Sequence, residues 1–456
     1  MELSQLLGAL QDKQTQNTQH DMTVLETAFR EVALSCGRAA LSKYLSEMSE
    51  AAPVCPNCGE PMRNLDKRSK TIVTLLGEVE YSRNYYGCCN VERECNEHAI
   101  PKDENLGVSG TRFTEAVKRV TAQIAASDSF KDTSSNLKFL CGIDVSAKEA
   151  EYIAKDCGAK IIEQQLQEIN AAFDIFSSAA SKPKAPIQKL YIEYDGTGVP
   201  IRKQELAGVK GKQPDGSAKT REIKTGCIFT QSRLDKDENP VRDADSASYF
   251  ANIGTMNEFS PLLYSEAVKR GVDHAQQVIV IGDGAKWIWS LAQEKFGGAT
   301  EIIDLYHAKE HVANLVKATI SDRVEIERQK KNLFELLENG DIDALVLGFR
   351  ELPATTDEQH NKIRVECNYF TENRKRMQYP AFRKQGLFVG SGVIEATCKN
   401  VIGKRLKQSG MHWSVAGANK IATLRCAVMS GAFETYLQPT ALNIHTFAPL
   451  DVVDAV

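Results

Sequence analysis

Gln188-Lys-Leu-Tyr-Ile-Glu-Tyr-Asp195-Gly-Thr-Gly-Val-Pro200 is the segment from which we predict the fold of the chain. Leu190, Ile192 and Tyr194 alternate with more polar residues, and this period of two predicts a β-strand. Asp195 ends the alternation and Gly-Thr-Gly follows it, so we expect the strand to end there and the chain to turn. The sequence therefore predicts a carboxylate at a rigid strand end.

Two further acidic residues stand in comparable positions. Gln277-Val-Ile-Val-Ile-Gly-Asp283-Gly is typical of a buried strand that ends in Asp-Gly, and Gly390-Ser-Gly-Val-Ile-Glu395 opens a predicted helix. Oxygen-only ligands suit Mg²⁺ or Mn²⁺, and a pair of such ions stabilises the attacking and leaving oxygens of a phosphodiester. We therefore predict that Asp195, Asp283 and Glu395 are catalytic and bind the metal.

The composition is that of a globular protein with several domains. The chain has 456 residues, of which 42% are hydrophobic and 25% charged. No apolar run reaches the roughly 20 residues that cross a bilayer, and the N-terminus lacks the pattern of a signal peptide, so we expect a cytoplasmic protein without a membrane partner. The formal net charge of −4 argues against nucleic-acid binding only weakly, because local basic surface decides such contacts.

A cysteine cluster predicts a small metal-binding module. Cys55-Pro-Asn-Cys58 has the spacing of a zinc knuckle, and two alternating runs, 71–76 and 79–86, predict a hairpin that returns the chain towards it. We expect a structural Zn²⁺ in a zinc-ribbon-like module, because four thiolates leave no open position for catalysis. The expected ligands are Cys55, Cys58, Cys88 and Cys95, with Cys89 or His98 as alternatives.

The remaining patterns divide the chain into regions. Phe130–Leu140, a turn at Cys141-Gly-Ile-Asp-Val and a capping box at Ser146-Ala-Lys-Glu149 outline a helix-turn-helix, which either reads DNA or only packs. We expect a helical region at 1–52, the zinc-ribbon-like module at 53–100, a helical, helix-turn-helix-like domain at 101–180, a catalytic domain at 187–430 and a C-terminal tail at 431–456.

The catalytic domain is predicted to be α/β. Strands at 188–195, at 223–230 and nearby are followed by a helix pattern from Tyr249 to Arg270, a strand at 278–281, and another at 301–305. Three early strands, a helix, a strand, a helix and a strand match the mixed sheet of a ribonuclease H-like fold. The charged, leucine-striped stretch at about 319–385 is expected to be an all-helical insertion before the last catalytic helix.

Basic residues accompany the third acid. Lys399, Lys404, Arg405 and Lys407 follow Glu395 closely, and lysines beside a metal-binding carboxylate suit a polyanionic substrate. We predict that these four residues contact DNA. Trp413 either stacks on a base or belongs to the core.

Several blocks together resemble DDE transposases of bacterial insertion sequences of the ISKra type, which are similar to the Mutator-like group. The similarity runs from about residue 50 to 430, and its blocks are Tyr194-Asp-Gly-Thr-Gly-Val-Pro200, Gly282-Asp-Gly-Ala-Lys-Trp-Ile288, Asp304-Leu-Tyr-His307, Gly390–Lys399 and Lys404–Trp413. The resemblance implies that Asp195, Asp283 and Glu395 are the catalytic acids. It also implies that Asp304 and His307, which match an Asp-x-x-His signature, lie near the active site as accessory residues.

The implied activity is transposition. The expected cofactors are Mg²⁺ or Mn²⁺ for catalysis and Zn²⁺ for structure. The expected partner is double-stranded DNA, both the terminal inverted repeats and the target, bound by a homodimer or larger assembly in the cytoplasm at the nucleoid. Cleavage at an element end would leave a free 3′-hydroxyl, which the same site then directs at a target phosphodiester.

Two other functions compete with this interpretation. His307-Ala-Lys-Glu310-His311 matches the inverted zincin motif His-x-x-Glu-His of zinc metallohydrolases, with two imidazoles one helical turn apart. That motif gives Asp195 and Asp283 no role. A DNA-binding protein with a decayed nuclease domain is the second alternative, and the presence of all three acids argues against it.

Overall fold

The structure is a computed structural model that describes residues 22–88, 95–173, 186–211, 213, 216–390 and 392–437. The chain divides into two compact units, one containing the residues up to Ala154 and the other Lys155–Gln438. Within the described ranges, no helix combines the length and apolar character needed to cross a bilayer.

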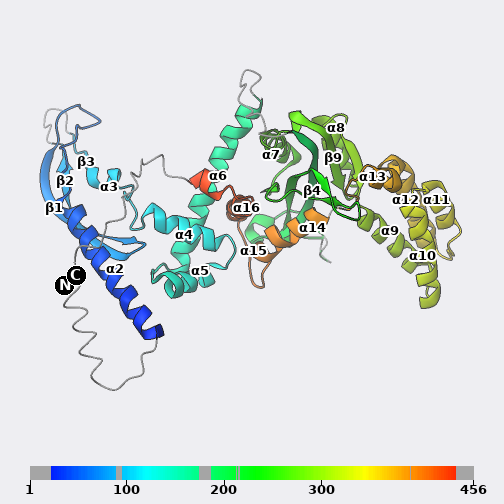
Figure 1. The fold of residues 1–456 in the computed structure, drawn as a ribbon, viewed down its shortest axis with the longest axis horizontal. Coiled ribbons are helices and arrows are strands. Elements are labelled where there is room, and N and C mark those ends of the chain that lie inside the picture. Colours follow the sequence, from blue (N-terminus) through cyan, green and yellow to red (C-terminus); the bar gives the residue numbers. More distant parts are fainter. Residues whose placement is uncertain are drawn as a thin grey trace. The chain divides into compact units, whose positions relative to one another are not determined.

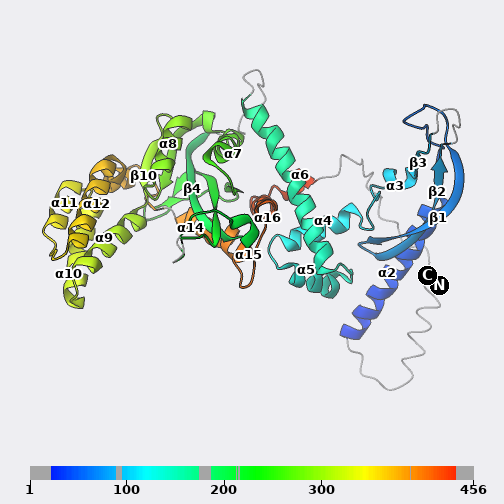
Figure 2. The same cartoon turned by 180° about the vertical axis from the view of Figure 1, so that it is seen from behind.

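The first unit contains the predicted hairpin and an N-terminal helix (Figure 2). Its elements are α2 (Met22–Glu47), β1 (Arg63–Thr74), β2 (Gly77–Gly87) and β3 (His98–Ala99). The strands form an antiparallel sheet in the order β1-β2-β3, and α2 packs against β2. Leu45 of α2 joins the buried residues Ile72, Val79 and Tyr81 in one apolar cluster, so the hairpin has a covered face.

A buried carboxylate ties the hairpin to the segment that follows it. Asp103 is 4% exposed, and its side chain accepts hydrogen bonds from Lys70 Nζ at 2.9 Å, from the Tyr81 hydroxyl at 2.6 Å and from Arg83. Burial alone would raise the pKa of Asp103, but the three donors outweigh it and lower the pKa below its ordinary value. The ionised form of Asp103 therefore stabilises the fold.

We predict that Asp103→Asn lowers the free energy of unfolding of this unit by about 3 kcal/mol, because two cations lose their buried partner. Because the folded pKa of Asp103 is depressed, its contribution is present above the unfolded pKa of about 3.9 and is lost as the pH falls through the folded value. Urea unfolding at several pH values measures both effects. A variant as stable as the wild type at pH 7 would contradict the prediction.

The predicted helix-turn-helix outline is present in the backbone. The elements are α3 (Pro101–Asn105), α4 (Glu115–Ala125), α5 (Phe130–Asn136), a π-helical turn (Leu137–Cys141) and α6 (Ala147–Phe173). Gly142 has φ +69° and ends the π-helical turn, as glycine at this left-handed position permits. Ser146 and Glu149 form the predicted capping box, since each backbone N–H donates to the other's side chain. A role in reading DNA remains a prediction.

The second unit is built on a five-stranded mixed sheet (Figure 1). Its strands are β4 (Ile187–Pro200), β5 (Thr220–Gln231), β8 (Ser248–Asn252), β9 (Ala275–Gly282) and β10 (Thr300–Ile303), and they are ordered β10-β9-β4-β5-β8. β5 is antiparallel to β4 and β8, whereas β9 and β10 run parallel to β4. With α7 (Met256–Lys269) before β9 and α8 (Lys286–Lys295) after it, the elements follow the predicted succession.

Two boundaries in this sheet differ from the prediction. β4 does not end at Asp195 but continues to Pro200, because β5 pairs with it as far as Pro200↔Thr220. A Cβ atom on Gly196 would lie 2.5 Å from Glu222 Oε1, so this glycine allows side chains to approach the strand and does not make a turn. The segment from Tyr249 is strand β8, and its helix begins only at Met256.

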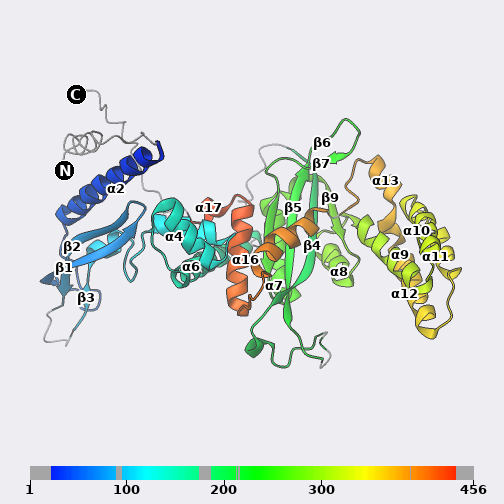
Figure 3. The same ribbon diagram turned by 90° about the horizontal axis from the view of Figure 1, so that it is seen from below.

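The two faces of β4 are covered by different helices. The Tyr194 hydroxyl donates to the backbone oxygen of Ile288 in α8, so the face of the even-numbered residues packs against the α7 and α8 side. The opposite face meets α14 (Gly392–Thr397), which lies across β4 and β5 (Figure 3). Figure 3 also shows the small ribbon of β6 (Arg233–Leu234) and β7 (Pro240–Val241).

The stretch that we expected to be an all-helical insertion is helical in the structure. After α9 (Leu305–Thr319) come α10 (Arg323–Glu338), α11 (Ile342–Arg350), α12 (Asp357–Asn373), a 3₁₀ turn (Arg374–Met377) and α13 (Tyr379–Lys384). α10 and α12 pack on α9, and α10 to α12 gather beyond the edge of the sheet (Figure 1). Leu333, Leu337 and Leu345 are buried as expected, but Leu347 is 57% exposed and does not belong to the apolar stripe.

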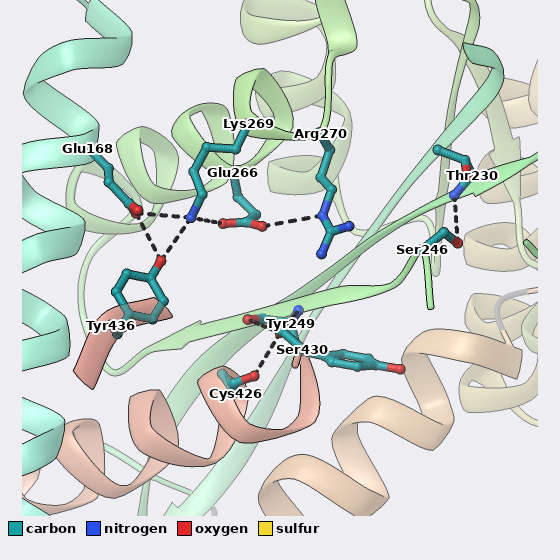
Figure 4. Close-up of polar contacts among 10 residues, drawn as sticks. All are labelled: Glu168, Thr230, Ser246, Tyr249, Glu266, Lys269, Arg270, Cys426, Ser430 and Tyr436. Atoms are coloured by element: carbon teal, nitrogen blue, oxygen red, sulfur yellow. Dashed lines mark hydrogen bonds and ion pairs between the residues drawn. The ribbon is translucent and has the colours of Figure 1, made fainter. Parts of the chain in front are cut away.

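The last helices complete the second unit. After α14 come a π-helical turn (Cys398–Gly403), α15 (Lys404–Leu406), α16 (Val415–Met429) and α17 (Phe433–Leu437). Besides the 3₁₀ turn at Arg374–Met377, two further 3₁₀ turns lie earlier in the unit, at Lys203–Leu206 and Val272–His274. Figure 4 shows the ion pairs and hydrogen bonds that connect α6, α7 and α17. Lys269 Nζ lies 3.0 Å from carboxylate oxygens of both Glu168 and Glu266, and it donates to the Tyr436 hydroxyl at 2.8 Å.

Candidate functional site

Strand register places Asp195 beside Asp283. The last parallel pair between β4 and β9 is Glu193↔Ile281, and each aspartate lies two residues further along its own strand direction. Neighbouring strands are about 4.8 Å apart, so the two aspartates stand at the same edge of the sheet. Burial raises the pKa of Asp195, and the nearby negative charge of Asp283 raises it further.

Backbone hydrogen bonds orient both carboxylates. The Gly196 N–H donates to Asp195 Oδ1 at 2.6 Å, and the Ala285 N–H donates to Asp283 Oδ1 at 2.9 Å. The Tyr369 hydroxyl of α12 donates to the backbone oxygen of Asp283 at 3.0 Å. The helical insertion therefore helps to hold the loop that carries the second acid.

The helix that contains the third acid contacts the same face of β4. The Ile394 N–H donates to Glu193 Oε2 at 2.8 Å, and Cys398 Sγ lies 3.8 Å from Asp195 Oδ2. Residues four apart on a helix share a face, and Glu395 lies between these two contacts in the chain. The backbone of Glu395 is thus close to Asp195, whereas its side chain lies outside what the structure describes.

Glu193 is a buried acid that the sequence reasoning missed. It is 0% exposed, and its Oε1 has no hydrogen-bond partner among the described residues. Burial raises the pKa of Glu193 to about 8, the Ile394 N–H lowers it, and the charge of Asp304 raises it. The signal was present in the sequence, because Glu193 and Asp195 are two apart on a strand and face the same side.

We predict that Glu193→Ala destabilises the fold by about 1–3 kcal/mol, because the Ile394 N–H loses its acceptor in a buried place. Glu193→Gln keeps an acceptor oxygen and should be close to neutral. Since the folded pKa of about 8 is above the unfolded value, the contribution of Glu193 is complete below about pH 4.3 and is lost as the pH rises through 8.

The measurement for Glu193 is thermal unfolding between pH 5 and pH 8. The wild type should lose more stability across this range than Glu193→Gln does. Equal losses in the two proteins would show that Glu193 does not titrate as its burial implies.

The two accessory residues lie in the same region. Asp304 is 1% exposed, begins α9 as its N-cap, and accepts from the His307 N–H at 2.6 Å through Oδ1. The Asp304 N–H donates to the backbone oxygen of Gly282, directly before the second acid. His307 is close enough to Asp195 to act on the pKa of that carboxyl, which burial raises and a charge on His307 would lower.

One histidine of the alternative zinc motif, His311, has partners outside the motif, whereas His307 Nδ1 lies 3.8 Å from Glu310 Oε2. His311 Nδ1 lies 2.9 Å from Glu366 Oε2, and the His311 ring stacks on Tyr369 with a centroid distance of 4.4 Å. The side chain of Glu310 is 73% exposed. Among the described residues, no group of three or more potential ligands includes His307 and His311, so this geometry does not form a zincin site.

The four predicted DNA-contacting cations differ in exposure. Lys399, Lys404 and Lys407 are exposed, and Lys407 Nζ donates to Thr197 Oγ1 at 2.6 Å. The prediction that Arg405 contacts DNA is wrong, because Arg405 is 0% exposed and its guanidinium lies 5.2 Å from the centre of the Trp413 ring. Trp413 is 6% exposed and its Nε1 donates to the backbone oxygen of Leu406, so the indole belongs to the core and not to a base-stacking surface.

The cysteine module brings its four predicted ligands together. One ligand atom from each of Cys55, Cys58, Cys88 and Cys95 lies within 4.8 Å of the others, and this group could hold a metal ion. The Cys55–Cys95 and Cys58–Cys88 sulfur distances are 3.6 and 3.4 Å, near the ~3.8 Å that a tetrahedral Zn²⁺ imposes. The four thiols therefore fit a structural Zn²⁺.

The alternative ligands of this module are placed less favourably. His98 lies outside the group of four and stacks on Tyr85 with a centroid distance of 5.0 Å. Cys89 falls outside the described residues. Burial would raise the pKa of the Cys55 thiol, but the backbone N–H groups of Cys58 and Asn57 outweigh it and lower the pKa to about 7.

We predict one Zn²⁺ per chain in the purified protein. Cys95→Ser should lower the zinc content by more than half, because a structural site needs all four thiolates, whereas Cys89→Ser should leave it unchanged. Elemental analysis after gel filtration measures both. Loss of zinc in Cys89→Ser with retention in Cys95→Ser would reassign the fourth ligand.

Comparison with known proteins finds similarity to an uncharacterised protein family. Residues 17–212 match the family model described as an uncharacterised protein family, UPF0236. A UPF0236 protein of Caldanaerobacter subterraneus subsp. tengcongensis is 22% identical over 422 residues, covering 90% of this chain and 78% of that protein. The name of that protein joins eleven locus designations.

Two further UPF0236 proteins, one from another organism, are similar to this chain. The UPF0236 protein in the vanSb 3′ region of Streptococcus gallolyticus is 23% identical over 384 residues, covering 81% of this chain and 74% of that protein. A second protein of the Caldanaerobacter strain, whose name joins four locus designations, is 21% identical over 421 residues. The similarity spans both units of the structure.

Proposed function

We propose that this chain is a DNA transposase of the DDE class, which cuts DNA at the ends of its element and joins the freed ends to target DNA. The observation that carries the proposal is the register of β4 and β9. It aligns Asp195 with Asp283, while contacts from Ile394 and Cys398 hold the Glu395 segment against the same strand.

The donor set at this place fits divalent cations that prefer oxygen. Asp195, Asp283 and Glu395 would hold Mg²⁺ or Mn²⁺. Two such metal ions would activate water and stabilise the leaving oxygen. The Gly196 and Ala285 N–H groups each donate to one carboxylate oxygen, Oδ1, and the Cys398 thiol lies 3.8 Å from Asp195 Oδ2, so a cation at Asp195 would replace this weak thiol contact. Both carboxylates must be ionised for this role, and a bound cation would oppose the effects that raise the pKa of Asp195.

The proposed chemistry has two balanced steps. In cleavage, a water oxygen bonds to phosphorus as the bond from phosphorus to the 3′-oxygen breaks, and the leaving oxygen takes a proton to become a 3′-hydroxyl. In strand transfer, that 3′-oxygen bonds to a phosphorus of the target and displaces the target's own 3′-oxygen. The number of phosphodiester bonds is conserved in transfer, so no nucleoside triphosphate is required.

The strand order and the comparisons agree with this proposal. The sheet order β10-β9-β4-β5-β8, with one antiparallel strand beside the central one, supports a ribonuclease H-like fold for the second unit. A name that joins eleven loci of one genome describes a sequence present in many copies, as expected for a mobile element. As part of the proposal, we infer that the present chain is also encoded by a mobile element.

The partner in this proposal is double-stranded DNA. Lys399, Lys404 and Lys407 offer exposed cations beside the acidic residues, where phosphates would lie. We expect the helix-turn-helix-like segment and the zinc-ribbon-like module to recognise the terminal inverted repeats, and paired ends to require a homodimer or a larger assembly. The zinc metallohydrolase alternative is less well supported, because His307 and His311 belong to no group of three potential ligands within 4.8 Å of one another in the described part of the chain.

The direct test is cleavage of DNA that carries the reading frame together with its flanking sequence. With Mg²⁺, the wild type should produce 3′-hydroxyl ends at the element borders, and Asp283→Ala should reduce this by at least about 1,000-fold, because removal of one metal ligand disables the site. Binding to the border DNA should survive in the variant.

Two matched variants serve as controls. Asp237→Ala removes an exposed aspartate elsewhere in the second unit and should leave cleavage unchanged. Glu310→Gln should also leave it unchanged, whereas a metallohydrolase of the His-x-x-Glu-His type would lose its activity. Full cleavage by Asp283→Ala would exclude the proposed site.

A further inference from the structure

A cavity of about 990 Å³ lies at the far end of β4, and it is larger than another cavity, of about 510 Å³, between residues of α7 and α8. One wall is formed by described residues of the segment that links β4 to β5, the first being Pro200 and the last Thr220. The other wall is the turn at 408–412 that precedes α16. Its volume is in the range of pockets that enclose a small molecule or a single base.

Backbone hydrogen bonds hold the two walls in place. The Arg202 N–H donates to the Trp413 oxygen at 2.8 Å, and the Trp413 N–H donates to the Pro200 oxygen at 3.1 Å. Within the first wall, the Ala218 N–H donates to the Val209 oxygen at 3.2 Å. The Val415 N–H donates to Glu205 Oε2, which adds a link between the walls. The cavity is therefore part of the folded structure.

The lining is cationic at the rim and apolar inside. Lys203, Lys210, Lys219 and His412 line it and are exposed, and none of the described lining residues is acidic. Leu206, Val209, Ile201 and Met411 supply buried or half-buried apolar surface. Cations around an apolar interior suit a ligand with a negative backbone and a flat, weakly polar ring.

The position of the cavity connects it to the acidic site. Asp195, Thr197 and Val199 face the same side of β4, and Pro200 at the cavity edge is five residues beyond Asp195. At about 3.3 Å per residue, the cavity edge lies roughly 16 Å from Asp195 along the strand. Lys407 Nζ contacts Thr197 Oγ1 between them, so a cation stands on the path from one to the other.

We propose that this cavity receives an unpaired nucleotide of the DNA strand, with its base inside and its phosphates at the lysine rim. This inference rests on the proposed function and specifies the substrate further. A spacing of about 3.4 Å per nucleotide puts the bound base about five nucleotides from the reacting phosphate, or fewer if the strand is stretched. A paired base cannot enter a concave pocket, so the duplex must open locally near the cut.

The test measures binding of a fluorescein-labelled oligothymidylate of about 20 nucleotides and of a duplex of the same length, without added magnesium. Ala207→Trp places a large ring at an exposed lining position and should fill the cavity. It should weaken oligothymidylate binding about tenfold, as loss of one bound base does, and leave duplex binding within about twofold.

A charge variant and a matched control complete the test. The double variant Lys210→Glu/Lys219→Glu should also weaken oligothymidylate binding, whereas Lys236→Glu, at an exposed lysine between β6 and β7, should not. Unchanged binding in both Ala207→Trp and the double variant would overturn the proposal, as would a wild type that does not bind the oligothymidylate.

The outcomes separate this proposal from the proposed function. Binding lost in Ala207→Trp without any DNA cleavage by the wild type would keep the cavity as a nucleotide site and reject the transposase. Cleavage that depends on Asp283 but proceeds normally in Ala207→Trp, together with unchanged oligothymidylate binding, would keep the transposase and reject the cavity.

Discussion

The parallel pairing of β4 with β9 is the constraint on which the candidate site depends. It extends to Glu193↔Ile281 and leaves Asp195 and Asp283 next to each other at the end of the paired region. Two like charges at this spacing repel each other, and burial of Asp195 adds a desolvation penalty to its ionised form. A fold that holds such a pair is suited to binding cations, which remove both penalties.

The surrounding elements reinforce this geometry from three directions. α14 contacts the odd-numbered face of β4 through Glu193, α9 begins beside Gly282 at Asp304, and α12 reaches the loop after β9 through Tyr369. The helical insertion is therefore not only an appendage, since one of its side chains supports the backbone of Asp283. Because these contacts involve buried groups, substitutions at the supporting residues should also disturb the site, and not only substitutions of the three acids.

Much of this architecture was predictable from local sequence, and the failures have physical reasons. The succession of strands and helices along the chain, the helical stretch after α9, the Ser146 capping box and the four-cysteine group follow from periodicity and spacing, which are local properties. Asp195-Gly-Thr-Gly was misread as a turn because pairing with β5, a contact far along the chain, keeps the glycines extended.

Burial was the other property that local patterns did not reveal. Arg405 was predicted to contact DNA, but tertiary packing places it beside Trp413 in the core. Glu193 was not predicted to be buried, because the apolar residues of the strand lie on one face and Glu193 lies on the opposite face, where an acid is usually exposed. The acidic residues themselves were identified from their order and from the family resemblance, and their shared role as ligands remains a prediction.

The central claim is that Asp195, Asp283 and Glu395 hold divalent cations together. A crystal structure of the protein soaked in Mn²⁺, with anomalous scattering data, tests it directly. The account predicts Mn²⁺ between Asp195 and Asp283, with Glu395 as a further ligand and a second ion within about 4 Å when DNA is bound. Carboxylates that point to separate places, with Mn²⁺ bound elsewhere or not at all, would contradict it.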